Sequence, residues 1–318
     1  MTSHEPGASG SRRGSILVTG MPRSGTTWLA RFLATGAGTA LTGREPMNPR
    51  GRQYALSNTV PGWTRLQQPA ARQRRALRLS YAGLTPWVYS RYGRRQWAAP
   101  LPWTRVVVKD PFAMLSIPAV HAVTSATSVL LYRHPAAALA SYRRMGWEPD
   151  LEELQPLVRA HQGEGHPAEL TAQDLPRHGE VSEPEAMGRF WAALYTMALS
   201  DAVRTPGTLV VSHEEIAAGG VDAARALFDA LGLSWTDRTT EELSAGEVGE
   251  AAEPPDAATG PSPLGAVAEP VRLHRLNRDP TTVARSWRAA VGDDDLESVE
   301  KVTRDVLRRL DEVRLRLL

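Results

Sequence analysis

The chain has 318 residues, of which 42% are hydrophobic and 23% are charged, and its formal net charge is +2. This length and apolar content allow a sizeable buried core, and we expect one large domain over residues 15–318. The absence of cysteine excludes disulfides, thiolate nucleophiles and thiolate metal ligands. Arginine supplies nearly all of the cations. Its planar fork suits phosphate and sulfate, although an Arg-rich and Ala-rich chain is also typical of a GC-rich genome.

Residues 1–14 are polar and predict a disordered tail that lacks the apolar core of a signal peptide. No run of eighteen apolar residues occurs, so no transmembrane helix is predicted. We therefore expect a soluble, cytoplasmic protein with neither a membrane nor a nucleic acid as partner. The sequence leaves open whether the chain forms a homo-oligomer.

Short apolar runs recur along the chain, and each is followed by a turn and a helical pattern. The runs predict strands over residues 15–19, 105–109, 128–133 and 208–212. Apolar residues at helical spacing predict helices over residues 28–35, 136–144, 183–203, 221–231 and 295–318. This alternation predicts a three-layer α/β fold, in which a central, mainly parallel sheet is flanked by helices.

Three segments interrupt the alternation. Residues 149–184 are rich in Pro, Gly, His and Gln and are expected to be irregular. Residues 247–270 have the composition of a flexible surface insertion. Residues 50–104 form an insertion between the first two predicted strands.

Eight aromatic residues lie between Tyr54 and Trp103. They include Trp63, Trp87, Tyr89, Tyr92, Trp97 and Trp103. Such an insertion between core strands predicts an apolar, aromatic-walled cleft. The same segment holds a basic run with Arg72, Arg74, Arg75 and Arg78. This run is interpreted as one solvated face of a helix, with a surface for an anionic acceptor or partner as the alternative.

Residues 20–27, GMPRSGTT, have the spacing of a phosphate-binding loop between a strand and a helix. In the nucleoside-triphosphate version of this loop a lysine follows the last glycine, but here Thr26 follows Gly25. Arg23 is the obvious substitute cation, and Thr26 or Thr27 is expected to cap the helix. Taken alone, the motif is also compatible with a tight turn that binds nothing.

A second candidate phosphate site follows the strand over residues 128–133. Arg133 ends this strand, and His134-Pro135 sets the start of the next helix. Ser141 lies one to two turns later on the same side as the arginine. An arginine fork and a hydroxyl at the carboxyl end of a strand would clamp a phosphate.

PRSGTTWL together with YRHPAAALAS resembles the sulfotransferases that use 3′-phosphoadenosine 5′-phosphosulfate (PAPS). The resemblance implies that the 5′-phosphosulfate is bound by Arg23, Ser24, Gly25, Thr26 and Thr27, and that Pro22 and Trp28 also belong to the donor site. It also implies that Arg133 and Ser141 hold the 3′-phosphate. Such a donor has no γ-phosphate for a lysine of the loop to reach.

Two later segments resemble further donor contacts of this family. ARSWRAAV, residues 284–291, is similar to the loop that closes over the 3′-phosphate and adenine. Arg285 and Arg288 are therefore donor-site candidates, with surface charge at a helix end as the alternative. Trp191 and Tyr195 occupy a place where family members often approach the adenine, with core packing as the alternative.

Sulfuryl transfer resembles phosphoryl transfer, a loose in-line displacement in which charge builds on the leaving bridge oxygen. The protein must supply cations near this oxygen and a base for the acceptor hydroxyl, and no metal is expected. Arg23 and Lys109 are the predicted cations, because Lys109 ends the strand over residues 105–109 at the same edge as both motifs.

The base does not follow the pattern of animal cytosolic sulfotransferases, which carry Lys-Thr-His after this strand. Here the chain reads Lys109-Asp110-Pro111, and it resembles instead the bacterial and glycan-type enzymes that use a glutamate after the first helix. Glu45 is the predicted base, and a dry pocket would raise its pKa toward neutrality. Its alternative is an ion pair with Arg44, Arg50 or Arg52. Asp110 is the second candidate base, and it could equally orient Lys109 or cap the next helix. His134 and His213 are interpreted as structural.

The resemblance implies transfer of a sulfuryl group from PAPS to a hydroxyl, with adenosine 3′,5′-bisphosphate (PAP) as product. The Arg-rich, Ala-rich composition favours a small secondary metabolite or a glycan as the acceptor. A role in bacterial natural product biosynthesis is expected. One alternative is a P-loop kinase or NTPase with residues 106–110 as its Mg²⁺-binding strand, against which the missing lysine and the Arg133–Ser141 pair count. Another is a nucleotide-binding module without activity, against which Arg23, Lys109 and Glu45 count.

Overall fold

The computed structural model describes residues 14–42, 45–49, 56, 59–84, 103–164, 175–177, 179–245 and 286–317. Nearly all of the expected N-terminal tail and all of the insertion over residues 247–270 lie outside the described residues. The division into one domain with two insertions stays a prediction. No helix in the described part of the chain is both long enough and apolar enough to span a membrane.

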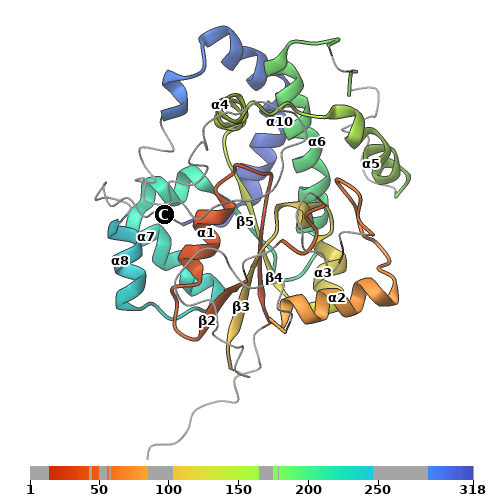
Figure 1. Cartoon of the computed structure of the whole chain (residues 1–318). Helices are drawn as coiled ribbons and strands as arrows, with labels where there is room; N and C mark the ends of the chain where they lie inside the picture. Colours follow the sequence, from red (N-terminus) through yellow and green to blue (C-terminus); the bar gives the residue numbers. More distant parts are fainter. Residues whose placement is uncertain are drawn as a thin grey trace, which may run out of the picture.

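In the described residues, one sheet of five parallel strands has the order β2-β3-β1-β4-β5 (Figure 1). The strands are β1 (Ile16–Thr19), β2 (Thr39–Thr42), β3 (Arg105–Lys109), β4 (Thr127–Tyr132) and β5 (Leu209–Ser212). The central strand β1 pairs with β3 on one side and with β4 on the other. The strand order therefore reverses next to β1, where open α/β sheets bind ligands at the carboxyl ends of their strands.

Helices cover both faces of this sheet, which confirms the predicted α/β fold class (Figure 1). One face is packed by α1 (Thr26–Leu33), α7 (His213–Leu231) and α8 (Asp237–Ala245). The other is packed by α2 (Ala71–Tyr81), α3 (Ile117–Thr124), α4 (Pro135–Met145), α5 (Leu151–Gly163), α6 (Glu183–Ala202) and α10 (Asp293–Val313). Two short 3₁₀ helices, η2 (Pro111–Leu115) and η4 (Ser286–Ala289), complete the described elements. The three central strands β1, β3 and β4 are largely buried on both faces, as apolar runs in a parallel sheet require.

Two predicted helix starts are wrong. α1 begins at Thr26 with Gly25 as its N-cap, so neither Thr26 nor Thr27 caps it. α7 begins at His213, eight residues before the expected start at Val221, and Gly220 (φ 53°) interrupts its helical geometry. The apolar spacing identified only the part of this helix that follows the interruption.

Residues 149–184, expected to be irregular, contain α5. Asp150 caps this helix by accepting a hydrogen bond from the Glu153 N–H at 3.0 Å, and Leu151, Leu154 and Val158 are buried at helical spacing. The helix starts with a capping side chain and keeps an apolar stripe, so the polar composition of the segment concealed a regular element.

The C-terminal helix was expected to run to residue 318, but α10 ends at Val313. Arg314 is extended (φ −62°, ψ 148°), and the Leu315 N–H donates to the Val210 carbonyl at 2.8 Å. The last residues therefore leave the helix and cover the free edge of β5, which would otherwise expose unpaired backbone groups.

Candidate active site

The loop between β1 and α1 has the geometry of an anion-binding loop. Arg23 (φ 75°) and Gly25 (φ 97°) are left-handed, and no side chain caps the first turn of α1. N–H groups that follow one another through such a turn, at an uncapped helix start, favour an anion. A Cβ atom at Gly20 would lie 2.1 Å from the Leu131 carbonyl oxygen, so a glycine is required where the loop rests on β4. The first residue of the loop is thus packed tightly against β4.

The structure brings the two phosphate motifs into direct contact. Arg23 donates from Nε to the Ser141 hydroxyl at 3.0 Å, and Arg133 donates from Nη1 to the Arg23 carbonyl at 3.5 Å. Ser141 and Arg133 are 1% and 5% exposed. Burial lowers the pKa of the Arg133 guanidinium, and the nearby Glu214 carboxylate opposes this shift. Two arginines, a hydroxyl and the start of α1 therefore surround one place at the carboxyl edge of the sheet.

Trp191 and Tyr195 lie in the core beneath this place, 1% and 0% exposed. Trp191 donates from Nε1 to the Arg133 carbonyl at 3.1 Å. The Tyr195 hydroxyl accepts from the Met21 N–H at 3.2 Å and donates to the Leu131 carbonyl at 2.8 Å. Their position corresponds to the core-packing alternative, since Trp191 binds the carbonyl of Arg133 directly after β4 and Tyr195 joins the loop to β4.

Lys109 and Glu45 form an ion pair beside the loop. The Lys109 ammonium contacts Glu45 Oε1 and also lies 3.3 Å from the Thr27 hydroxyl of α1. Asn48 donates to the other carboxylate oxygen of Glu45. Lys109 is 15% and Glu45 17% exposed in their side chains, so both keep access from outside. Glu45 therefore forms an ion pair, as its alternative interpretation expects, but its partner is Lys109. Arg44, Arg50 and Arg52, the partners expected for it, lie outside the described residues.

Asp110 is fully buried directly behind this pair. Its Oδ2 accepts from the Met47 N–H at 2.6 Å, and its Oδ1 accepts from the Phe112 N–H at 3.2 Å as the N-cap of η2. Burial and the nearby Glu45 raise the pKa of Asp110 to about 8. Asp110 thus fixes the segment that carries Glu45 to the end of β3.

This raised pKa predicts a measurable pH dependence of folding. The folded-state pKa lies above the usual 3.8, so between about pH 4 and pH 8 the folded chain holds a proton that the unfolded chain has lost. Asp110 therefore makes the free energy of unfolding fall by about 1.4 kcal/mol per pH unit as the pH rises through this window. Asp110→Asn is expected to lack this slope, as measured by urea denaturation at about pH 5 and about pH 8.

The control for this experiment is Asp150→Asn, which removes an exposed carboxylate that also caps a helix. We expect the pH profile of this variant to run parallel to that of the wild type. A parallel profile for Asp110→Asn as well would contradict the raised pKa.

The two histidines near the site have structural contacts. The His213 ring lies 2.5 Å from the place where a Cβ of Gly25 would stand, and burial, then Arg133, lower its pKa to about 3. His134 caps α4 by accepting from the Ala136 N–H at 3.3 Å. Burial, then Arg288, lower the pKa of His134 to about 4. Both imidazoles are therefore neutral at physiological pH.

The remaining donor candidates lie around these histidines. Trp28 stacks on Phe32 with ring centroids 5.5 Å apart. Trp287 stacks on His134 at 4.6 Å, and the Arg288 guanidinium lies over the Trp287 ring at 5.6 Å. The structure thus brings Arg288 to the start of α4, while Arg285 lies outside the described residues.

Glu214 is not among the site residues predicted from the sequence, although the structure places it beside Arg133. Its Oε1 accepts from the His134 N–H at 3.0 Å, next to Arg133. Burial raises the pKa of Glu214, and the His134 N–H and Arg133 oppose this shift. The apolar spacing predicts this helix only from Val221, so it does not include the first turn of α7, which lies next to the end of β4.

The aromatic insertion is only partly described. Trp63 is buried against Phe112 and Phe190, with ring centroids 4.7 and 6.2 Å away, whereas Trp103 is 73% exposed. Trp87, Tyr89, Tyr92 and Trp97 lie outside the described residues. The basic run lies on α2, where Arg72, Arg74, Arg75 and Arg78 are exposed. The predicted cleft therefore stays a prediction.

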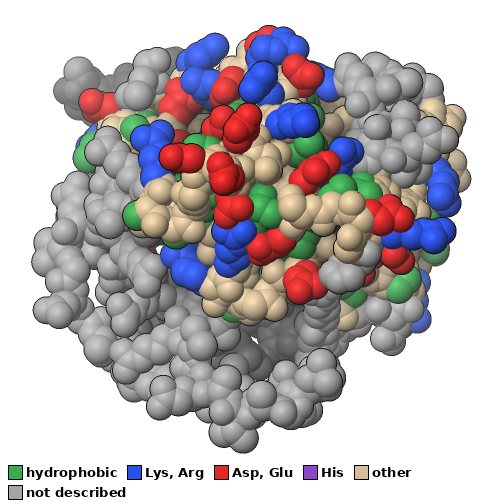
Figure 2. Space-filling view, turned by 90° about the horizontal axis from the view of Figure 1, so that it is seen from above, with side chains coloured by type: hydrophobic (Ala, Val, Ile, Leu, Met, Phe, Trp, Pro, Cys, Tyr) green, Lys and Arg blue, Asp and Glu red, His purple; other side chains and the backbone are tan. Residues whose placement is uncertain are grey.

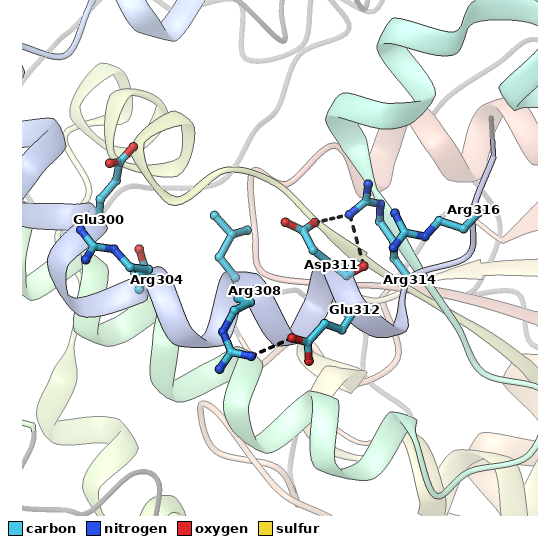
Figure 3. Close-up of a pocket in the computed structure, with 9 residues that line it drawn as sticks. Glu300, Arg304, Arg308, Asp311, Glu312, Arg314 and Arg316 are labelled. Atoms are coloured by element: carbon cyan, nitrogen blue, oxygen red, sulfur yellow. Dashed lines mark hydrogen bonds and ion pairs between the residues drawn. The ribbon is translucent and has the colours of Figure 1, made fainter.

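The face shown in Figure 2 carries acidic and basic side chains side by side. A cavity of about 520 Å³ lies along α10 (Figure 3). It is lined by Glu300, Thr303, Arg304, Leu307, Arg308, Asp311, Glu312, Arg314 and Arg316. Arg308 pairs with Glu312 and Arg314 with Asp311, each at 2.7 Å, and no predicted site residue lines the cavity.

Comparison with known proteins matches residues 15–237 to the family model described as the sulfotransferase family. No curated protein matches the chain. Among solved structures, mouse sulfotransferase SULT7A1 complexed with PAP aligns with a TM-score of 0.45 and 14% identity, over 95% of this chain and 88% of that chain. The sulfotransferase domain of the Synechococcus PCC 7002 olefin synthase aligns with a TM-score of 0.44 and 15% identity, over 94% and 98%. STF9 from Mycobacterium avium aligns with a TM-score of 0.39 and 13% identity, over 94% and 77%.

Proposed function

The chain belongs to the sulfotransferase family, and we propose that it transfers the sulfuryl group of PAPS to a hydroxyl of a small metabolite or a glycan, leaving PAP. The observation that carries this proposal is the hydrogen bond from Arg23 to Ser141. It joins the loop after β1 to the helix after β4. The two proposed anion sites are adjacent in this arrangement, which supports a nucleotide donor with phosphates on both sides of its ribose.

The residues present fit such a donor. The start of α1, with Arg23, Ser24, Thr26 and Thr27, offers N–H groups, hydroxyls and a cation to the 5′-phosphosulfate. The clamp of Arg133 and Ser141 offers a fork and a hydroxyl to the 3′-phosphate. We place Arg288 at the edge of the same site, because it reaches the start of α4 through Trp287.

Lys109 supplies a second cation beside the loop. It comes from β3 instead of α1, yet its ammonium lies 3.3 Å from the Thr27 hydroxyl. We propose that Lys109 and Arg23 stabilise the charge that builds on the leaving bridge oxygen during transfer. Lys109 would then exchange its contact with Glu45 for the donor.

Glu45 is the proposed base for the acceptor hydroxyl. Two carboxylates lie near Lys109, and they differ in access: Glu45 is 17% exposed in its side chain, whereas Asp110 is fully buried. Both oxygens of Asp110 accept backbone N–H groups, and no part of its side chain is exposed to an acceptor hydroxyl. Asp110 supports the Glu45 segment in this mechanism.

The test of donor binding is calorimetric titration with PAP and, separately, with ATP plus Mg²⁺. We expect PAP to bind and ATP to bind much more weakly, because ATP offers no 3′-phosphate to Arg133. Transfer is then tested with labelled PAPS against a panel of hydroxyl acceptors, both small molecules and glycans. Tight binding of ATP with Mg²⁺ and none of PAP would favour a kinase or NTPase.

Turnover is expected to persist in excess EDTA, because the cations proposed for the bridge oxygen are side chains of the protein. The measurement is the transfer rate of labelled PAPS with and without the chelator, and the control adds Mg²⁺ back. A rate that EDTA abolishes and Mg²⁺ restores would contradict the proposed roles of Lys109 and Arg23.

A further inference from the structure

Glu214 occupies a defined position behind the clamp. It lies in the first turn of α7, where Oε1 accepts from the His134 N–H at 3.0 Å and Oε2 lies 3.4 Å from the Ser212 hydroxyl. These two contacts fix the carboxylate beside the peptide that joins Arg133 to His134. The register of β4 and β5, with Tyr132 opposite Ser212, brings the two chain segments together.

Arg133 has both positive and negative side chains near it. Arg133 is 5% exposed, and the nearby cations Arg23 and Arg144 act against its positive charge. Glu214 is a nearby acidic group that offsets them. A guanidinium in this environment depends on a counter-charge, because a buried charge without one is costly.

We infer that Glu214 is the internal counter-ion of Arg133 and weakens the binding of the 3′-phosphate that competes for the same guanidinium. This inference rests on the proposed function, in which Arg133 holds that phosphate. The donor and PAP carry the same 3′-phosphate, so the clamp acts on substrate and product alike. A carboxylate behind the clamp keeps the product from being held too tightly, which matters because product release limits many enzymes.

Glu214→Gln tests the inference with little change in shape. The glutamine carbonyl can still accept from the His134 N–H, while the negative charge is gone. We expect E214Q to bind PAP about 10-fold more tightly than the wild type, or about 1.4 kcal/mol. Binding of adenosine 5′-monophosphate, which has no 3′-phosphate, is expected to change by less than about twofold. Both affinities are measured by calorimetry at the same ionic strength.

The matched control is Glu215→Gln, in the same helical turn. Glu215 faces the other way, accepting from Arg314 Nε at 2.7 Å and from the Leu317 N–H at 3.2 Å. We expect this variant to leave the affinity for PAP unchanged. If E214Q does not fold, Glu214→Asp and Glu214→Asn repeat the comparison, because their side chains have the same length and differ in charge. The Asn variant should bind PAP more tightly than the Asp variant.

Three results would overturn the inference: E214Q binds PAP no better than the wild type, E215Q gains as much, or adenosine 5′-monophosphate gains as much as PAP. A wild-type chain that does not bind PAP would contradict the proposed function instead. The two failures are therefore distinguishable in one set of titrations.

Discussion

Replacing Arg133 with alanine is expected to weaken the binding of PAP by about 30-fold and to change the binding of adenosine 5′-monophosphate by less than about twofold. A charge-assisted hydrogen bond contributes on the order of 2 kcal/mol, and only PAP carries the 3′-phosphate that would receive it. Because Arg133 also donates to the Arg23 carbonyl at 3.5 Å, the substitution could disturb the loop as well. Titration with both ligands separates the two effects.

Two companion variants sharpen this experiment. Arg133→Ala leaves the Glu214 carboxylate without its neighbouring cation and should lower the thermal stability of the protein. The double variant Arg133→Ala, Glu214→Gln should recover part of this lost stability. Arg133→Lys keeps the charge without the fork and should lose part of the affinity for PAP. An equal loss for PAP and adenosine 5′-monophosphate would remove Arg133 from the 3′-phosphate site.

Central strands were readable from the sequence, whereas the edge strand β2 was not. The segment over residues 105–109 was predicted with its observed bounds, because three valines lie between two charged residues and the strand has neighbours on both sides. The four residues of β2, TALT, pair with β3 alone and are not fully buried. A short, partly polar edge strand lacks the apolar run on which the prediction depended.

The residue types of the site were predictable, but their pairings were not. Glu45 and Lys109 are 64 residues apart, and they meet because Thr42, the last residue of β2, lies opposite Val108 in β3. Sequence spacing carries no information about strand order or register. The contact between Glu214 and the His134 backbone depends in the same way on the pairing of β4 with β5.

Glu45→Gln is expected to lower turnover by about 100-fold or more while leaving the affinity for PAP within about twofold. Glutamine keeps the size of the side chain and its contact with Asn48, but it has no carboxylate to accept the proton of the acceptor hydroxyl. The assay uses the acceptor identified with labelled PAPS, and PAP affinity is measured by calorimetry.

Asp110→Asn is the matched control, because it also removes a carboxylate close to Lys109. Asp110 is fully buried and its oxygens are occupied by backbone N–H groups, so its loss should act mainly through stability and through the position of the Glu45 segment. Glu45→Gln should instead lower kcat without changing the urea concentration at which half of the protein is unfolded. If Glu45→Gln kept near-wild-type turnover while Asp110→Asn abolished it with PAP binding intact, Asp110 would be the base that accepts the proton of the acceptor hydroxyl. The ion pair of Glu45 with Lys109 would then serve only to hold the lysine at the loop.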